Sequence, residues 1–231
     1  MTPTTQSSTQ NSIGAGELTT TGTALLAGPL LLLGYGVVRL LDGHHGPGPG
    51  WTAGHILLVL GLLCFVPAML TLRRTAAGSG PARRATATAG AVLGLLGIGA
   101  VLGQAAVDLY VGAVSADRAA MNTRYDHFQS HPGVTPLLYS VVPVFFYLGL
   151  LLLTCALALG RPRPRRLGLH APLCVLLGTL VMAASLDLMP VGALLFSAAF
   201  GPLALSLLRR GRAEEQSASC QSRPNGVGTA V

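Results

Sequence analysis

The chain lacks lysine altogether, and all 15 of its strongly basic residues are arginines. Acidic residues are also scarce, since only 8 of the 231 positions are Asp or Glu, and charged residues make up 10% of the chain. Hydrophobic residues make up 51%. A soluble domain needs a more polar surface than this composition supplies, so the balance argues against a soluble domain and predicts a membrane protein.

Motifs that carry chemistry are missing as well. The four cysteines (Cys64, Cys155, Cys174 and Cys220) share no CxxC spacing, and three of them fall in apolar segments, where cysteine behaves as a small apolar residue. Nucleophile elbows, glycine-rich phosphate loops and intramembrane protease patterns are absent. Haem would need histidines that face one another at the same depth, and none are predicted to do so. We therefore expect no cofactor and no redox chemistry.

The two ends of the chain are polar. The first 22 residues have no basic side chain and are rich in Ser, Thr and Gln. Because a secretory signal begins with a positively charged region, the first apolar stretch is predicted to remain in the protein as a helix. Residues 1–22 and 209–231 carry too little apolar surface to fold alone, so both are expected to be disordered tails.

Six apolar segments are each long enough to cross a bilayer, which takes roughly 20 residues of α-helix. Little of the chain is left for a soluble domain. The sequence therefore predicts an all-α, polytopic membrane bundle of six transmembrane helices within residues 23–208. The predicted helices cover residues 23–41, 51–72, 89–114, 137–159, 169–186 and 191–208.

Arginine is distributed unevenly among the gaps between these segments. Twelve of the 15 arginines lie in three regions, at 73–84, 161–166 and 209–223, whereas the alternate gaps carry only Arg118 and Arg124. Since cytoplasmic loops are enriched in basic residues, both termini are predicted to be cytoplasmic, in a protein of the cell membrane. The net charge of +7 then reflects topology and attraction to anionic lipid, and nucleic acid is not a predicted partner.

A faint internal repeat accompanies this topology. Arginine pairs at 83–84 and 165–166 each precede an apolar helix that ends in Asp-Leu and then Val-Gly-Ala, at 108–113 and 187–193. The match predicts a duplicated hairpin, helices two–three and four–five, related by an axis along the membrane normal. Apolar sequence of low complexity also produces such matches by chance, so both explanations stay open.

The third predicted helix carries a stripe of small and polar residues. Small residues on one face let helix backbones approach closely, and the polar members of the stripe are costly to expose to lipid. This helix is therefore predicted to be central, with its stripe facing inward. The stripe follows helical spacings of four and three and consists of Gly90, Gly94, Gly97, Val101, Gln104 and Asp108.

Asp108 at the end of this stripe has two interpretations. It is either part of a proton, ion or substrate site, or an acid at the outer membrane interface that is hydrated or paired with an arginine. We favour the second interpretation, because the residue lies near the predicted outer end of its helix and not at mid-membrane.

Other polar residues are predicted at the same outer level. Arg39 ends the first predicted helix, His55 opens the second and Asp187 ends the fifth. If the bundle closes around the third helix, these residues join Gln104 and Asp108 in one polar cluster at the outer face.

Each of these residues also has a simpler role. Arg39 can pair with Asp42 or extend to the membrane interface. His55 can occupy the interface beside Trp51, a typical aromatic anchor. Asp187 can organise the tight turn between the last two helices.

The second outer loop contains His127 and His131. On a helix, His-x3-His places both rings on one face, a spacing that zinc can use. Pro132 and Gly133 end any such helix directly after the second histidine, and no cysteine completes a ligand set. We therefore predict no metal site and treat these histidines as solvated.

The chain resembles small six-helix integral membrane proteins of high-GC actinobacteria to which no function is assigned. The resemblance rests on the exclusive use of arginine, on spans rich in Ala, Gly and Leu, and on the segments GHILLVLGLLCFVPAML and RPRPRRLG. It implies a plasma-membrane location and no particular activity.

Two functional classes remain. The first is a non-enzymatic membrane protein, a small transporter, accessory or sensor, that uses the outer polar cluster and has the lipid bilayer as its only predicted partner. The second is a membrane-embedded enzyme acting on a lipid or outer-leaflet substrate, with Asp108, Asp187 and His55 as acid–base groups. An enzyme needs these groups around one substrate position, and a transporter needs a polar cavity that reaches the midplane. The absence of catalytic motifs favours the first class.

Overall fold

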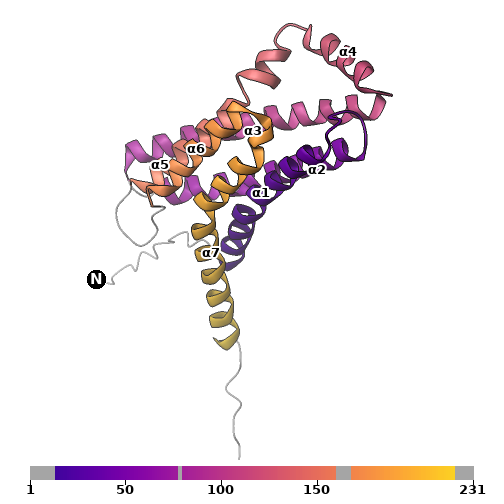
Figure 1. The fold of residues 1–231 in the computed structure, drawn as a ribbon. Helices are drawn as coiled ribbons and strands as arrows, with labels where there is room; N and C mark the ends of the chain where they lie inside the picture. Colours follow the sequence, from indigo (N-terminus) through magenta and orange to yellow (C-terminus); the bar gives the residue numbers. More distant parts are fainter. Residues whose placement is uncertain (1–13, 78–79, 160–167, 222–231) are drawn as a thin grey trace, which may run out of the picture.

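The structure, a computed structural model, describes residues 14–77, 80–159 and 168–221 (Figure 1). Within these ranges all regular secondary structure is helical. A polar helix, α4, is inserted between the apolar helices. The elements are α1 (Ala15–Leu41), α2 (Pro49–Ala77), α3 (Pro81–Val114), α4 (Arg118–Gln129), the π-helix η1 (Thr135–Ser140), α5 (Val144–Ala158), α6 (His170–Ala184), the 3-10 turn η2 (Leu186–Leu188) and α7 (Met189–Gln221).

Among the described residues, five apolar helical segments are long enough to cross a bilayer: α1, α2, α3, η1 with α5, and η2 with α7. The structure thus confirms an all-helical chain with helices of membrane-spanning length. The sixth apolar helix, α6, has only 15 residues. That length corresponds to about 22 Å of helix, against a hydrocarbon core of about 30 Å. Six complete spans therefore remain a prediction.

The chain itself ends α6 early. Ser185 has extended backbone angles (φ −161°, ψ 138°), and its hydroxyl accepts a hydrogen bond of 3.2 Å from the backbone N–H of Asp187. This local bond starts the turn that leads into α7, as serine commonly does at the beginning of a helix. Asp187 therefore lies in a turn between two helices, as its simpler role predicts.

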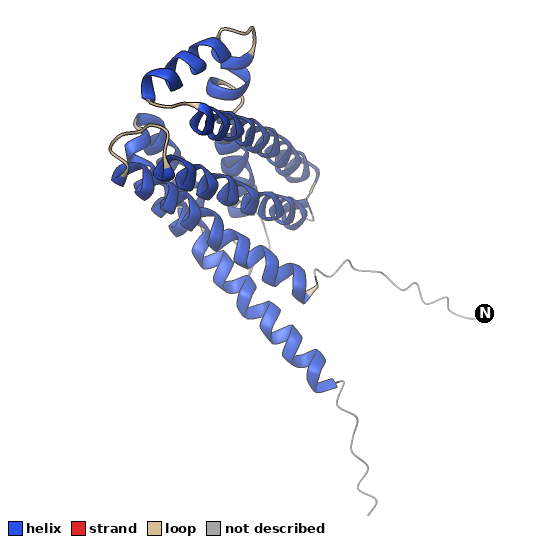
Figure 2. Ribbon diagram, turned by 90° about the vertical axis from the view of Figure 1, so that its right-hand side faces the viewer, coloured by secondary structure: helices blue, strands red, loops and turns tan. Residues whose placement is uncertain are grey.

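The helices form a bundle with two distinct ends. α1 packs against α2 and α7, α3 packs against α2 and α5, and α6 packs against α5 and α7. α1 and α7 lie side by side and antiparallel (Figures 1 and 2). We call one end, where α1 and α3 finish and α2 and α7 begin, the α4 end, because α4 lies over it (Figure 1). The opposite end is called the basic end.

Aromatic rings fill the space between α2, α5 and α7. Phe65, Phe146, Phe196 and Phe200 are all 0–2% exposed. Phe65 meets Phe146 and Phe200 edge to face, with ring centroids 5.2 and 6.1 Å apart. Such contacts favour close packing, so this part of the bundle is a solid core.

The glycines of the α3 stripe lie where α3 meets α5. A Cβ added to Gly149 of α5 would lie 2.5 Å from the backbone oxygen of Gly90 and from the Cα of Gly94. A Cβ at Gly97 would overlap the backbone of Phe146. The two helices therefore touch backbone to backbone, a distance that only glycine permits.

Two helices extend into the expected tails. α1 begins at Ala15 instead of residue 23, and α7 continues to Gln221 instead of ending at 208. Both helices reach past the expected tail boundaries, and their extensions contact one another. A Cβ at Gly22 would lie 2.8 Å from Leu208, and Gly211 packs against Thr19. Residues 1–13 and 222–231, the remainder of those tails, lie outside the described residues.

The predicted outer loop at 115–136 contains a helix that the sequence analysis did not anticipate. The Asp117 carboxylate accepts a hydrogen bond of 2.8 Å from Ala120 N–H and so caps the start of α4. Met121 is only 2% exposed and anchors the helix to the bundle. The helix ends at Gln129, and Gly133 follows with φ +85°. Its end before Pro132 agrees with the expected helix stop.

Candidate functional site

His55 and Asp108 meet in the interior of the α4 end. His55 of α2 is 5% exposed and Asp108 of α3 is 7% exposed. The His55 Nε2 and Asp108 Oδ2 atoms are 3.4 Å apart. The other ring nitrogen, Nδ1, lies 2.8 Å from the carbonyl oxygen of Trp51. Since a carbonyl only accepts, we assign the hydrogen of that bond to Nδ1.

This assignment determines the chemistry of the pair. With Nδ1–H donating to Trp51, a neutral His55 ring presents only a lone pair at Nε2. A lone pair facing a carboxylate is repulsive, so the contact is favourable only when one proton lies on Nε2 or on Asp108. The contact between His55 and Asp108 therefore depends on a proton at one of the two groups.

Tyr125 of α4 completes the network. Its hydroxyl donates a hydrogen bond of 2.8 Å to Asp108 Oδ1. Burial raises the pKa of the Tyr125 phenol well above its ordinary value, and the charge of Asp108 raises it further, so this phenol stays protonated as a donor. We call His55, Asp108 and Tyr125 the buried triad. It joins α2, α3 and α4.

Aromatic side chains enclose the histidine ring. Trp51 lies over His55 with ring centroids 4.3 Å apart, and Tyr35 of α1 meets the same ring edge to face at 5.7 Å. The indole Nε1–H of Trp51 donates a hydrogen bond of 2.9 Å to the backbone oxygen of Asp108. Gly112 makes this possible, because a Cβ there would lie 2.6 Å from the indole. The enclosure keeps bulk water from the pair.

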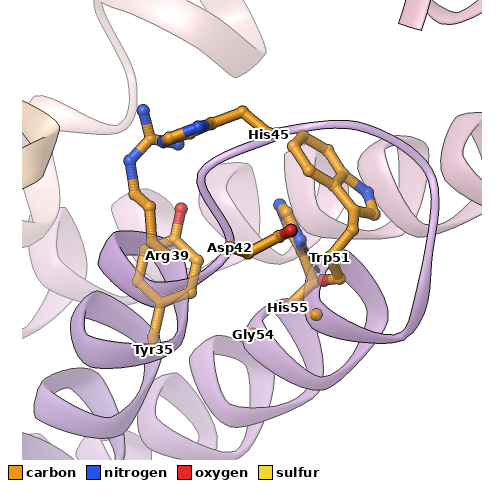
Figure 3. A pocket seen from close by; sticks show the side chains of 8 residues that line it. Tyr35, Arg39, Asp42, His45, Trp51, Gly54 and His55 are labelled. Atoms are coloured by element: carbon orange, nitrogen blue, oxygen red, sulfur yellow. Dashed lines mark hydrogen bonds between the residues drawn. The ribbon is translucent and has the colours of Figure 1, made fainter.

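Arg39 and Asp187 form a second pair beside the triad. Arg39 Nε lies 3.4 Å from Asp187 Oδ1, with side chains that are 23% and 60% exposed. Arg39 also lines a cavity of about 20 Å³ together with Tyr35 and His55 (Figure 3). That volume accommodates about one water molecule.

The structure therefore brings four of the five predicted cluster residues into one neighbourhood. His55 and Asp108 form one pair, Arg39 and Asp187 form the other, and Arg39 and His55 line the same small cavity. Gln104 is half-buried one turn before Asp108, and its side chain makes no hydrogen bond within the described residues. The pairing of Arg39 with Asp42 that its simpler role predicts is replaced by the pair with Asp187.

Tyr125 is the residue that sequence reasoning missed. It lies in a segment that was predicted to be a loop, and a loop gives no periodicity from which to predict a partner. A signal does exist in that segment, because Met121, Tyr125 and Phe128 follow helical spacings of four and three. The pattern predicts a short amphipathic helix with Tyr125 on its inner face.

The histidines of α4 and the loop after it do not form a ligand set. The His127 and His131 rings meet edge to face with centroids 5.4 Å apart. His131 Nδ1 lies within hydrogen-bond distance of the backbone oxygens of His127 and Phe128. Across the described ranges no group of three His, Cys, Asp or Glu side chains could hold a metal ion.

Comparisons with protein-family models, curated proteins and solved structures give no match. The class of protein therefore follows from fold and site alone. It is an all-helical chain with helices of membrane-spanning length, and a buried His–Asp–Tyr network lies at one end.

Proposed function

We propose that the chain is a non-enzymatic, multi-pass membrane protein of the sensor or accessory kind, in which the buried triad attaches α4 to the bundle in a proton-dependent way. The observation that carries this proposal is the buried contact between His55 and Asp108, together with the hydrogen bond from Tyr125 of α4 to Asp108. A change of one proton at this pair alters the bond that holds α4.

Both the gain and the loss of a proton at the pair weaken the attachment of α4. Protonation of Asp108 while His55 is charged removes the ion pair and weakens the acceptor of the Tyr125 hydroxyl. When the pair has no proton, the lone pair of His55 Nε2 faces a charged carboxylate, and the two groups repel one another. The attachment is therefore strongest while the pair holds one proton, and α4 loosens at either extreme.

The neighbouring charges belong to the same response. The triad faces Tyr35 and Arg39 from α1, and the charge of Asp108 also reaches Tyr139 of η1. Asp187 neutralises Arg39 from the turn before α7.

The geometry gives less support to the enzyme alternative. Acid–base catalysis needs groups that reach a bound substrate. His55 and Asp108 are under 10% exposed, and the cavity beside His55 has room for about one water molecule. Asp187 is engaged with Arg39. The solid aromatic core between α2, α5 and α7 likewise does not favour the transporter form of the proposal.

The orientation proposed from the sequence agrees with this arrangement. Arg74 contacts Glu17 of α1 and Arg73 contacts Thr88 of α3, so the arginines that end α2 lie at the basic end. The arginines of α7 lie near the start of α1, because Gly211 packs on Thr19. We propose that the basic end is cytoplasmic and that the α4 end faces outward in the cell membrane.

Hydrogen exchange along α4 tests the proposal. In nanodiscs, the amides of α4 are expected to exchange faster at about pH 5 than at about pH 7, because an additional proton at the pair weakens the acceptor of the Tyr125 hydroxyl. The chain has a single tryptophan, and it lies on His55, so its emission should follow the same titration.

Variants separate the triad from other titrating groups. His55→Gln and Asp108→Asn should both abolish the pH dependence of exchange in α4. His44→Gln, a change at an exposed histidine in the connection after α1, should leave it intact. A pH dependence that persists in both triad variants would overturn the proposal.

A further inference from the structure

A groove of about 780 Å³ lies between the last turns of α3 and the helix α4. This volume falls within the roughly 300–1,000 Å³ of pockets that hold small ligands. α3 contributes Ala106, Val107 and Tyr110 to its walls, and α4 contributes Thr123, Arg124 and His127. None of the buried triad lines the groove, so it is a separate site.

The α3 wall is apolar and belongs to a helix of membrane-spanning length. Ala106, Val107 and Tyr110 share one face of the helix, at spacings of one and three. Tyr110 is 64% exposed, and Val114, one turn further on, is 40% exposed. A tyrosine at the end of a spanning helix is typical of the level where lipid headgroups begin. The apolar wall therefore continues toward the lipid.

The α4 wall is polar and positively charged. Ala120, Thr123, Arg124, His127 and Phe128 line the groove at positions i, i+3, i+4, i+7 and i+8, which is one face of a helix. The neighbouring face, with Tyr125, is held against the bundle.

Arg124 is the charged group of this wall and is not neutralised. It forms no ion pair or hydrogen bond within the described residues. The acids of the same segment are directed elsewhere: Asp117 caps the helix, and Asp126 is not among the groove-lining residues. A guanidinium beside an imidazole N–H is suited to bind phosphate oxygens.

We propose that this groove binds one anionic phospholipid of the membrane leaflet at the α4 end, with its phosphate at Arg124 and His127 and an acyl chain along Val107 and Tyr110. The charge and the apolar wall select this occupant together. A free phosphate would leave the α3 wall uncovered, and a zwitterionic lipid would bring the cation of its headgroup close to Arg124. Basic pockets at the ends of membrane helices recognise lipid headgroups by this combination.

Native mass spectrometry of the detergent-purified protein with added phosphatidylglycerol or phosphatidylcholine tests the proposal. Phosphatidylglycerol should bind with a stoichiometry of one and in preference to phosphatidylcholine. Arg124→Gln should weaken phosphatidylglycerol binding about fivefold, as expected for one basic side chain near an anionic headgroup, and Arg124→Lys should restore most of it. Arg118→Gln removes the same charge from the same helix outside the groove and should have little effect.

A second pair of variants tests the apolar part of the site. Ala120→Leu fills the groove and should weaken both lipids, whereas Ala119→Leu adds the same side chain at an exposed position outside it. Unfolding of a variant is recognised by loss of the Trp51 emission of the folded protein.

Several outcomes would overturn the proposal. Equal losses in Arg124→Gln and Arg118→Gln would show general attraction to charge and no site. Full competition by inorganic phosphate would indicate an anion site without lipid. A dimer that Ala120→Leu dissociates would show that a second copy of the chain occupies the groove. None of these outcomes depends on protons at the triad, so they leave the proposed function to its own test.

Discussion

At the α4 end, His55 and Asp108 meet with side chains that are 6% and 9% exposed, whereas Arg74 and Glu17 at the basic end meet with side chains that are 63% and 36% exposed. The exposed pair is the closer one, at 2.6 Å against 3.4 Å. Water screens exposed charges, so such pairs contribute about 0–1 kcal/mol, whereas removing one member of a buried pair costs about 3–5 kcal/mol. Burial, and not distance, therefore separates the two ends in energetic terms.

The largest expected loss of stability follows from removing one member of the buried pair of His55 and Asp108. Asp108→Ala should lower the free energy of unfolding by about 3 kcal/mol or more, because His55 and Tyr125 both lose their buried partner. Reversible unfolding in mixed detergent and SDS measures the change. Glu17→Ala is the matched control at the basic end and should cost less than about 1 kcal/mol. Equal losses in the two variants would show that burial does not separate the pairs.

A smaller effect is expected at the backbone contact between α3 and α5. Gly97→Ala should destabilise the protein by about 1–3 kcal/mol, because its Cβ overlaps the backbone of Phe146. Gly99→Ala, on the same helix, has nothing within 4 Å of the added Cβ and should be neutral or stabilising by up to about 1 kcal/mol. The same unfolding measurement applies. If both variants behave alike, α3 and α5 are not in backbone contact.

Removal of one hydroxyl sharpens the comparison further. Tyr125→Phe should cost about 1.5 kcal/mol, the usual contribution of a hydrogen bond to a charged group. Because the bond joins α4 to α3, hydrogen exchange should quicken in α4 and stay unchanged at the basic end. Ser130→Ala, directly after α4 at a hydroxyl that donates to the backbone oxygen of His127, is the control. Uniform quickening along the chain would contradict an attachment confined to α4.

The smallest effect concerns alkaline pH. Burial and the nearby charge of Asp108 raise the pKa of Tyr125, so its folded pKa lies above the value of about 10 in an unfolded chain. Below pH 10 the phenol is protonated in both states, and no stability is lost. Above that pH the detached state releases the proton more readily, so the attachment of α4 weakens as pH rises. Tyrosinate absorbance should show this late step, and Tyr125→Phe should remove it.

Much of the architecture was predictable from sequence because it depends on local composition. Long apolar runs specify helices wherever water is excluded, so the positions of α2, α3 and α5 follow from residues near one another in the chain. The glycine spacing at Gly90, Gly94 and Gly97 likewise marks one helix face, and the structure places that face against α5. The extensions of α1 and α7 could not be predicted from local composition, because each is stabilised by contacts with the other, between segments far apart in the chain.

For the candidate site, the sequence predicted which residues take part but not how they pair. Sequence placed Arg39, His55, Asp108 and Asp187 at one level of the membrane, but it did not pair them. Trp51 and Asp108 are 57 positions apart in sequence. Only the packing of α2 on α3 brings the indole Nε1 of Trp51 within 2.9 Å of the backbone oxygen of Asp108. Gln104 shares the stripe with Asp108, but its side chain forms no hydrogen bond within the described residues. A helix face does not meet the same neighbour along its whole length.

The amino-acid sequence by itself determined that this is an apolar, helical membrane protein whose arginines distinguish one end from the other. Those properties arise from local hydrophobicity and from charge counted along the chain. Only the tertiary structure decided that His55 and Asp108 meet in the interior, that Tyr125 donates a hydrogen bond to Asp108, and that an unneutralised Arg124 faces an apolar wall. Each of these depends on which helices touch and at what register, which is a balance of packing among segments far apart in the chain.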